Sequence, residues 1–119
     1  MKKNKGPRHK SPIPLDDAQI DAVATLFAIL SEPSRLRILQ VLKQGPRSVT
    51  DLVERSALKQ ANVSKQLGLL LSAGLIARKQ DGNHAIYSIA MPLVVELCEL
   101  VCDGIARQAA ARAVALKGQ

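Results

Sequence analysis

One stretch constrains the fold more than any other: Lys59–Leu75, with the sequence KQANVSKQLGLLLSAGL. Its apolar residues recur at helical spacing, at Val63, Leu67, Leu70 and Leu71. Gly74 follows the last apolar turn, where a helix commonly ends on a left-handed residue. The N-terminal half of this predicted helix would face away from the core with Gln60, Asn62, Ser64, Lys65 and Gln66.

That polar face carries amides, a hydroxyl and an ammonium, with Lys59 just before it. These groups are the donors and acceptors that read base edges in the major groove of DNA. The alternative is an ordinary amphipathic helix whose polar face is only solvated. The rest of the chain has to decide between the two.

Length and composition favour one helical domain. A chain of 119 residues can build one core but not two of comfortable size. Phe27 and Tyr87 are the only aromatic residues, so the core must be built from aliphatic side chains, which suits packed helices. The same scarcity argues against a binder of single-stranded nucleic acid, because such proteins stack bases on aromatic rings.

The formal net charge of +7 is concentrated in the first residues. Five basic residues precede Asp16, which leaves +2 for residues 16–119. Residues 1–15, which also contain Gly6 and three prolines, are predicted to form a disordered basic arm, and residues 16–119 the folded domain. The arm either touches DNA phosphates without specificity or has no role.

Several classes of protein are not expected. No apolar run is long enough for a transmembrane helix, and no apolar signal-peptide core follows the basic N-terminus. Two cysteines do not make a disulfide framework, so a reducing cytoplasm is expected. An enzyme is also unexpected, because the chain has no Gly-rich phosphate loop and no nucleophile beside a plausible base.

Three helices are predicted before the central stretch. Asp16 or Asp17 can cap a helix that ends near Leu30, and Pro33 can open a second that ends before Gly45-Pro46. The second is apolar over two faces and should be central. Thr50 is the predicted N-cap of a third, short helix that ends near Ser56. This short helix and the next, joined by a tight link, form a helix-turn-helix.

A hairpin should follow. The runs Leu75–Ala77 and Ala85–Ile89 have strand character, and Asp81-Gly82 between them is a hairpin signal. A hairpin directly after a helix-turn-helix makes a winged helix. Near its tip, Arg78, Lys79 and His84 could lie along the phosphate backbone or a minor groove, or they could belong to a solvated turn.

A long last helix is predicted from about Met91 to Ala115, opened by Pro92. A small domain has trouble covering both this helix and the first one. We therefore expect a homodimer in which the first and last helices of two copies pack around a two-fold axis. The apolar stripe of the last helix comprises Leu93, Val94, Leu97, Val101 and Ile105.

These motifs, in this order, resemble the ArsR/SmtB family of bacterial winged-helix repressors, over roughly residues 24–105. Leu30–Leu39 (LSEPSRLRIL) is similar to the family's L-S-D-P-T-R-L-R-I-L, and Thr50–Leu52 to the entry of its first DNA-proximal helix. Asn62–Leu67, followed by Leu70 and Ala73–Ile76, looks like A-V-S-x-H-L…L…A-G-L-V, with Gln66 at the family's common His. The resemblance implies a homodimer that binds double-stranded DNA at an inverted-repeat operator and represses transcription until a signal releases it.

The inducer sites of the family mostly do not carry over. Metal-responsive members read E-L-C-V-C-D-L where this chain has Pro46–Leu52, so Ser48 and Thr50 replace both thiols. Other members bind zinc between their last helices through Asp and His, but no histidine follows His84 here. Persulfide-sensing relatives pair a cysteine of the second helix with one of the last, and the second helix here has none.

Cys98 and Cys102 remain, four residues apart and so on one side of the last helix. Thiolates suit As(III), Cu(I), Zn(II) or Cd(II), yet two are too few for a closed tetrahedral site. Further ligands would come from the second copy or from the arm, where His9 is the conventional donor. Some arsenic-sensing relatives carry thiols in this helix. The alternative is that both cysteines are small apolar residues packed in the dimer seam.

The sequence thus predicts a mainly α winged helix-turn-helix repressor, and a thiol-reactive inducer such as a soft metal, arsenite or reactive sulfur is one reading of Cys98 and Cys102. Two alternatives stay open: a regulator of the same fold without metal or redox sensing, and a winged-helix module for protein contacts. The predicted DNA contacts are Lys59, Gln60, Asn62, Ser64, Lys65, Gln66, Arg78, Lys79 and His84.

Overall fold

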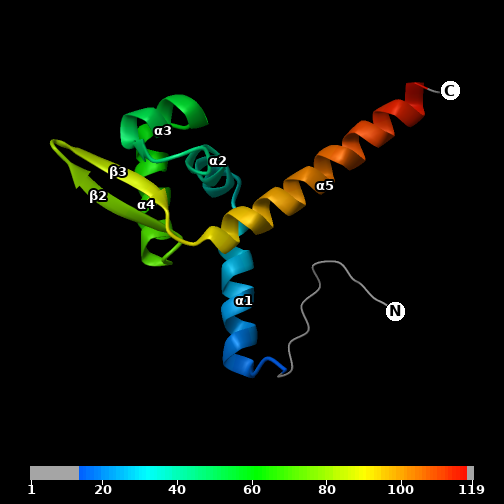
Figure 1. Ribbon diagram of the computed structural model, residues 1–119, viewed down its shortest axis with the longest axis horizontal. Helices are drawn as coiled ribbons and strands as arrows, with labels where there is room; N and C mark the ends of the chain where they lie inside the picture. The colour runs from blue at the N-terminus through cyan, green and yellow to red at the C-terminus, as the bar shows by residue number, and fades with distance from the viewer. Residues whose placement is uncertain (1–13, 118–119) are drawn as a thin grey trace.

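The computed structural model describes residues 14–117, which form five helices and one three-stranded sheet (Figure 1). The helices are α1 (Asp17–Leu30), α2 (Pro33–Leu42), α3 (Val49–Ser56), α4 (Gln60–Ser72) and α5 (Pro92–Lys117), and the strands β1 (Arg47–Ser48), β2 (Ile76–Asp81) and β3 (His84–Ile89). The predicted basic arm, apart from Pro14 and Leu15, lies outside the described residues. None of the described helices is long and apolar enough to cross a membrane.

The first two helices begin where the sequence predicted. Asp16 caps α1 through a capping box, in which its carboxylate accepts the Gln19 N–H at 2.8 Å and the Gln19 amide accepts the Asp16 N–H at 2.9 Å. Glu32 caps α2 by accepting the Ser34 N–H at 2.7 Å and the Arg35 N–H at 3.2 Å. Pro33 occupies the first turn, where a missing N–H costs nothing.

The start of α3 differs from the prediction. Ser48, not Thr50, is the N-cap, and its hydroxyl accepts the Asp51 N–H at 3.2 Å. The physical reason is a long-range strand pairing, in which Arg47 lies opposite Tyr87 and Ser48 opposite Ile86. This pairing holds the chain extended up to Ser48, so the helix begins at the next residue and Thr50 lies inside it.

The end of α4 is the glycine-capped end expected from the sequence. Gly74 has a φ of +79°, and its N–H bonds to the Leu71 carbonyl at 3.0 Å. The Leu75 N–H returns to the Leu70 carbonyl at 3.1 Å, which completes a Schellman motif. The chain leaves this turn directly into β2.

The wing is longer than predicted, and its turn is shifted by one residue. β2 and β3 pair from Ile76 opposite Ile89 to Asp81 opposite His84, so the loop is Gly82-Asn83 rather than Asp81-Gly82. Gly82 supplies the positive φ, +63°, that a two-residue hairpin loop needs at its first position. The sheet order is β1-β3-β2.

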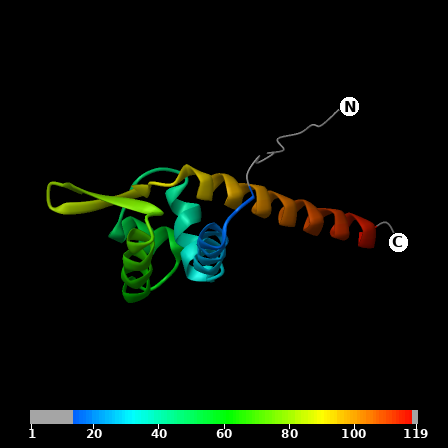
Figure 2. The same ribbon diagram turned by 90° about the horizontal axis from the view of Figure 1, so that it is seen from below.

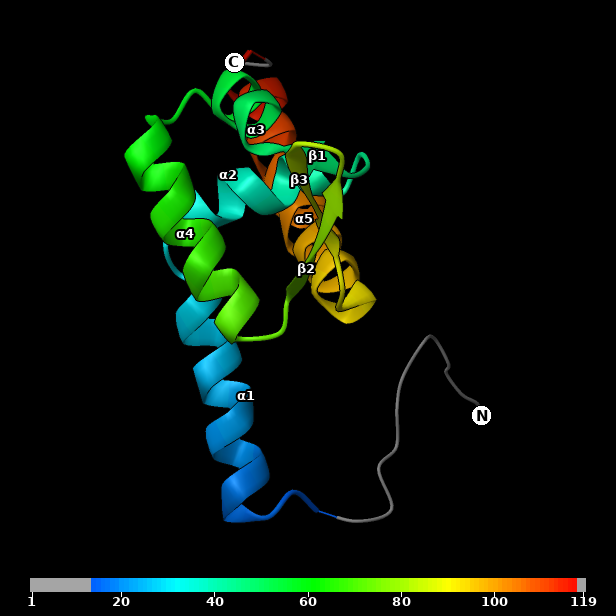
Figure 3. The same cartoon turned by 90° about the vertical axis from the view of Figure 1, so that its left-hand side faces the viewer.

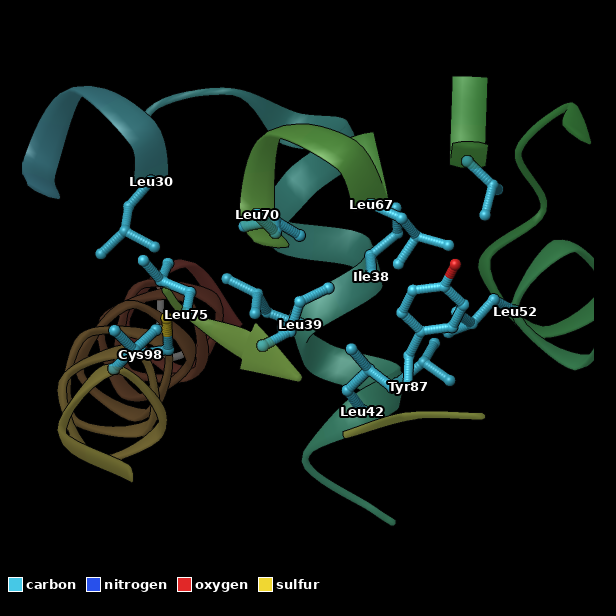
Figure 4. Close-up of a cluster of buried hydrophobic side chains, with 14 residues drawn as sticks. Leu30, Ile38, Leu39, Leu42, Leu52, Leu67, Leu70, Leu75, Tyr87 and Cys98 are labelled. Carbon is cyan, nitrogen blue, oxygen red and sulfur yellow. The ribbon is translucent and has the colours of Figure 1, made fainter. Parts of the chain in front are cut away.

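The core is aliphatic and centred on α2, as predicted. Figure 4 shows Ile38, Leu39 and Leu42 of α2 in the middle of the core, with Leu52 and Tyr87 on one side and Leu30 and Cys98 on the other. Val63, Leu67 and Leu70 supply the stripe of α4 that packs against it. α2 can occupy this central place because its apolar residues cover two of its faces.

The first and last helices project from this compact unit in different directions (Figures 1 to 3). Of α1, only Leu30 is buried, and Phe27 is 53% exposed. A series of large apolar side chains on these two helices is likewise exposed: Ile20, Val23, Leu93, Leu100, Val101, Ile105, Val114 and Leu116. Apolar surface of this extent is typical of a protein interface.

Candidate nucleic-acid interface

Two helices, α3 and α4, form the helix-turn-helix. Ala57 ends α3 in the left-handed conformation, with φ of +62°, and Leu58 and Lys59 connect it to α4. In Figure 3, α4 lies on the outside of the domain, with α2 behind it. Because its buried stripe faces α2, the opposite side of α4 is free to enter a groove.

The outward side of α4 contains four of the residues assigned to DNA reading. Lys59, Gln60, Ser64 and Lys65 are all exposed. Lys59 is the N-cap residue but makes no side-chain cap, so its side chain does not occupy the first N–H groups of the helix. Those N–H groups and the positive end of the helix dipole favour a phosphate.

The placement of Gln66 on this outer face was wrong. Gln66 is only 4% exposed, and its Oε1 accepts a hydrogen bond from Arg35 Nε at 2.9 Å. The spacing of Gln66 indicates that it is buried. It follows Val63 by three residues and precedes Leu70 by four, which places it on the buried stripe. The polar residue type obscured that spacing.

Asn62, which was also assigned to the reading face, is half-buried and faces the same way as Gln66. Its Oδ1 accepts from Gln66 Nε2 at 2.9 Å, and its Nδ2 donates to Ser34 Oγ of α2 at 3.0 Å. The amide that was predicted to read bases is therefore engaged within the protein.

The wing carries its charges along the strands rather than in a loop. Arg78 and Lys79 lie within β2, His84 begins β3, and all three are exposed. Neighbouring residues of a strand point to opposite faces, so Arg78 and Lys79 present their cations on opposite sides of the wing. Arg78 also donates to Gln80 Oε1, at 3.4 Å.

Two further cations beside the helix-turn-helix are paired internally. Asp51, in the first turn of α3, accepts from Arg47 Nη1 at 3.1 Å and from Arg55 Nε at 3.2 Å. Partial burial acts to raise the pKa of Asp51, but hydrogen bonds and attraction from the two arginines outweigh it and lower the pKa below its usual value. The carboxylate thus stays ionised at neutral pH, and both arginines are held against α3.

The two cysteines lie at the junction of α1, α2 and α5 but in different environments. Cys98 is 9% exposed, whereas Cys102 is exposed and accepts a hydrogen bond from Gln40 Nε2 at 3.1 Å. Burial raises the pKa of the Cys98 thiol, and the charge of Cys102 raises it further. The positive charge of Lys43 acts in the opposite direction but does not cancel these effects, so the pKa is raised. Both thiols line a cavity of about 340 Å³ together with Phe27, Leu30, Ser31, Leu36, Leu97 and Val101.

These thiols do not complete a metal site by themselves. Within residues 14–117, no three side chains of His, Cys, Asp or Glu come together in a way that could hold a metal ion. His9, the further donor considered from the sequence, lies outside the described residues.

A helix-turn-helix with an outward polar helix and a hairpin wing defines a winged-helix DNA-binding protein. Comparison with known proteins agrees, since residues 30–79 match a family described as a helix-turn-helix domain. The chain is 40% identical over 95 residues to the uncharacterised HTH-type transcriptional regulator Rv0081 of Mycobacterium tuberculosis, covering 79% of this chain and 83% of that protein. It is 37% identical over 92 residues to the regulator NmtR of the same organism, covering 77% of each.

Solved structures show the same fold. The crystal structure of Rv0081 aligns with a TM-score of 0.70 at 38% identity, covering 82% of this chain and 98% of that one. A homodimeric winged helix-turn-helix domain from Mycobacterium bovis, described as a possible ArsR-family regulator, aligns with a TM-score of 0.70 at 30% identity, covering 80% and 91%. The predicted fold class is therefore confirmed.

The chain belongs to the ArsR/SmtB family of helix-turn-helix transcriptional regulators. Its curated relatives include the repressor SmtB of M. tuberculosis, 30% identical over 95 residues, which cover 80% of this chain and 68% of SmtB. The family regulates transcription by binding DNA and is not a family of enzymes.

Proposed function

We propose that this chain is a sequence-specific transcriptional repressor that acts in the cytoplasm as a homodimer on an inverted-repeat operator. The proposal rests on two exposed surfaces of the domain that differ in polarity. α4 presents polar side chains outward, while α1 and α5 leave their apolar stripes uncovered. The first surface suits DNA and the second suits a further copy of the chain.

The proposed dimer interface is supported by the exposed apolar residues on α1 and α5. Phe27 on α1 and Val101 and Ile105 on α5 are each more than half exposed. The relative from M. bovis is homodimeric. A two-fold arrangement would provide two copies of α4 for two half-sites about 34 Å apart, which is one turn of DNA.

Base reading is tested by comparing α4 with the wing. Ser64→Ala or Gln60→Ala should lower the ratio of operator to random-DNA affinity about tenfold, because each removes a group able to bond a base edge. Lys79→Ala should weaken both affinities alike and reduce the slope of log affinity against log salt by about two, because the homodimer loses one phosphate contact from each of its two wings. The operator is first selected from a random duplex library, and affinities are then measured by fluorescence anisotropy.

The opposite pattern would show that the roles of α4 and the wing are exchanged. Binding that is weak and independent of sequence in the unaltered protein would favour the alternative, a winged-helix module for protein contacts. Glu54→Ala, an exposed change on α3 outside both surfaces, is the matched control and should leave the ratio unchanged.

We further propose that a thiol-reactive inducer, such as a soft metal ion, arsenite or a reactive sulfur species, acts at Cys98 and Cys102. Support comes from their shared cavity, which lies at the apolar faces of α1 and α5 that a second copy would cover. Two relatives bear names that concern soft elements, a probable mercury resistance operon repressor of Streptomyces lividans and an antimony-specific repressor. Occupation of the cavity would favour a dimer geometry in which the two α4 helices no longer match successive major grooves.

The inducer is sought by titrating As(III), Cd(II), Zn(II) and a polysulfide against the operator complex. An inducer is expected to weaken operator binding about tenfold, within the usual range of allosteric coupling. Cys102→Ser should abolish this response but leave binding without inducer intact, because a hydroxyl is a much poorer ligand than a thiol for a soft ion, and the remaining thiol, Cys98, is buried with a raised pKa. No response to any of the four agents would mean that the cysteines only pack.

A further inference from the structure

Resting on the proposed DNA-binding function, we propose that Arg35 is a positioning residue that sets operator specificity through Gln66 and Asn62. These residues form one continuous chain of hydrogen bonds that crosses α1, α2 and α4. None of the three needs to touch a base. They act by fixing the orientation of α4, and with it the exposed residues that do.

The chain of bonds begins at the end of α1. Arg35 Nη1 donates to the Ile29 carbonyl at 3.0 Å, and Arg35 Nε donates to Gln66 Oε1 at 2.9 Å. Gln66 Nε2 donates to Asn62 Oδ1 at 2.9 Å, and Asn62 Nδ2 donates to Ser34 Oγ, back on α2, at 3.0 Å. One guanidinium therefore holds α4 against both α1 and α2.

Arg35 also sets the direction of every bond in this chain. A guanidinium can only donate, so the oxygen of the Gln66 amide must face it. The Gln66 nitrogen must then face Asn62, whose oxygen accepts, which leaves the Asn62 nitrogen to donate to Ser34. A single charged group thus selects one orientation for two amides, each of which could otherwise turn around.

Burial makes this arrangement costly to break. Gln66 is almost fully buried, and Arg35 and Asn62 are half-buried. Without its acceptor on Gln66, Arg35 would keep one donor of a partly desolvated charge unpaired. The bonds therefore resist both rotation of α4 about its axis and sliding along it.

The effect on DNA follows from helical geometry. Ser64 and Lys65 lie two and one residues before Gln66 on the same rigid helix, so any rotation of α4 moves their side chains with it. A base-edge hydrogen bond tolerates only a small displacement, whereas a phosphate contact through a long side chain tolerates more. Loss of the network should therefore reduce discrimination more than it reduces non-specific binding.

The test compares two replacements of Gln66. Gln66→Leu, of similar size, removes both bonds and should lower the ratio of operator to random-DNA affinity about tenfold, with random-DNA affinity changed less than about twofold. Gln66→Glu should keep the ratio within about threefold, because its carboxylate can still accept a hydrogen bond from Arg35. The Asn62 amide can turn so that its nitrogen donates to the carboxylate, and the Ser34 hydroxyl can then donate to the Asn62 oxygen. Gln44→Leu, the same change at an exposed position outside the network, is the matched control.

A ratio that stays unchanged in Gln66→Leu while the melting temperature falls would overturn the proposal, because the network would then only stabilise the fold. If Gln66→Leu does not fold, Ser34→Ala takes its place. A ratio lowered at least about threefold in Ser34→Ala would support the proposal, and an unchanged ratio would overturn it.

Failure of the underlying function would look different. In that case the unaltered protein itself would not distinguish operator from random DNA, and Ser64→Ala would have no effect on the ratio. A protein that discriminates, and loses discrimination with Ser64→Ala but not with Gln66→Leu, would retain the proposed function and refute only the role of Arg35.

Discussion

Phe27→Asp is expected to convert the protein to a monomer and to lower its affinity for the operator about 100-fold or more. Phe27 is 53% exposed on the uncovered stripe of α1, which also contains Ile20 and Val23, and the proposed dimer interface would bury it. A carboxylate there would be desolvated without a partner. A monomer would engage only one half-site and would lose the gain from linking two binding events.

Sedimentation velocity gives the oligomeric state of this variant, and fluorescence anisotropy its operator affinity. Thr25→Asp is the matched control, because it places the same charge on α1 roughly 200° around the helix from Phe27. It should leave the dimer intact. If the Phe27→Asp protein remains dimeric, the dimer interface does not include this part of α1.

Leu70→Ala is expected to lower the free energy of unfolding by about 2–5 kcal/mol. The Leu70 side chain is 0% exposed, on the stripe of α4 that packs against α2, so truncation leaves a cavity at the centre of the core. Leu69→Ala, the neighbouring leucine on the same helix, is 42% exposed and should cost less than about 1 kcal/mol.

Urea unfolding of both variants, followed by circular dichroism at one fixed protein concentration, checks this difference. The concentration must be the same because dimerisation contributes to the apparent stability of the folded state. Equal losses in the two variants would contradict the packing of α4 described above.

Local signals in the sequence predicted most of the helical framework. Asp16, Glu32 with Pro33, and Gly74 each determine a helix end through bonds to residues within five positions, so their roles can be read without the fold. The central place of α2 could also be predicted, because apolar side chains on two faces require cover on both sides.

The errors arose where distant parts of the chain decide the outcome. The pairing of β1 with β3 moves the cap of α3 from Thr50 to Ser48, and that pairing links residues about forty positions apart. Gln66 and Asn62 were assigned to the DNA face by residue type, because their inward partners, Arg35 and Ser34, come from another helix. The position of each residue around α4 was predictable, but the partner that makes a buried amide favourable was not.

The order of the sheet has a consequence for solubility. β2 is an edge strand, so within residues 14–117 no strand pairs with its outer side, and five of its six residues are exposed. An open strand edge can template pairing with another chain and lead to aggregation. Arg78 and Lys79 place a positive charge on each face of this edge, so two wings that approached each other would repel. The cations assigned to DNA contact would therefore also keep free molecules of the protein from joining edge to edge.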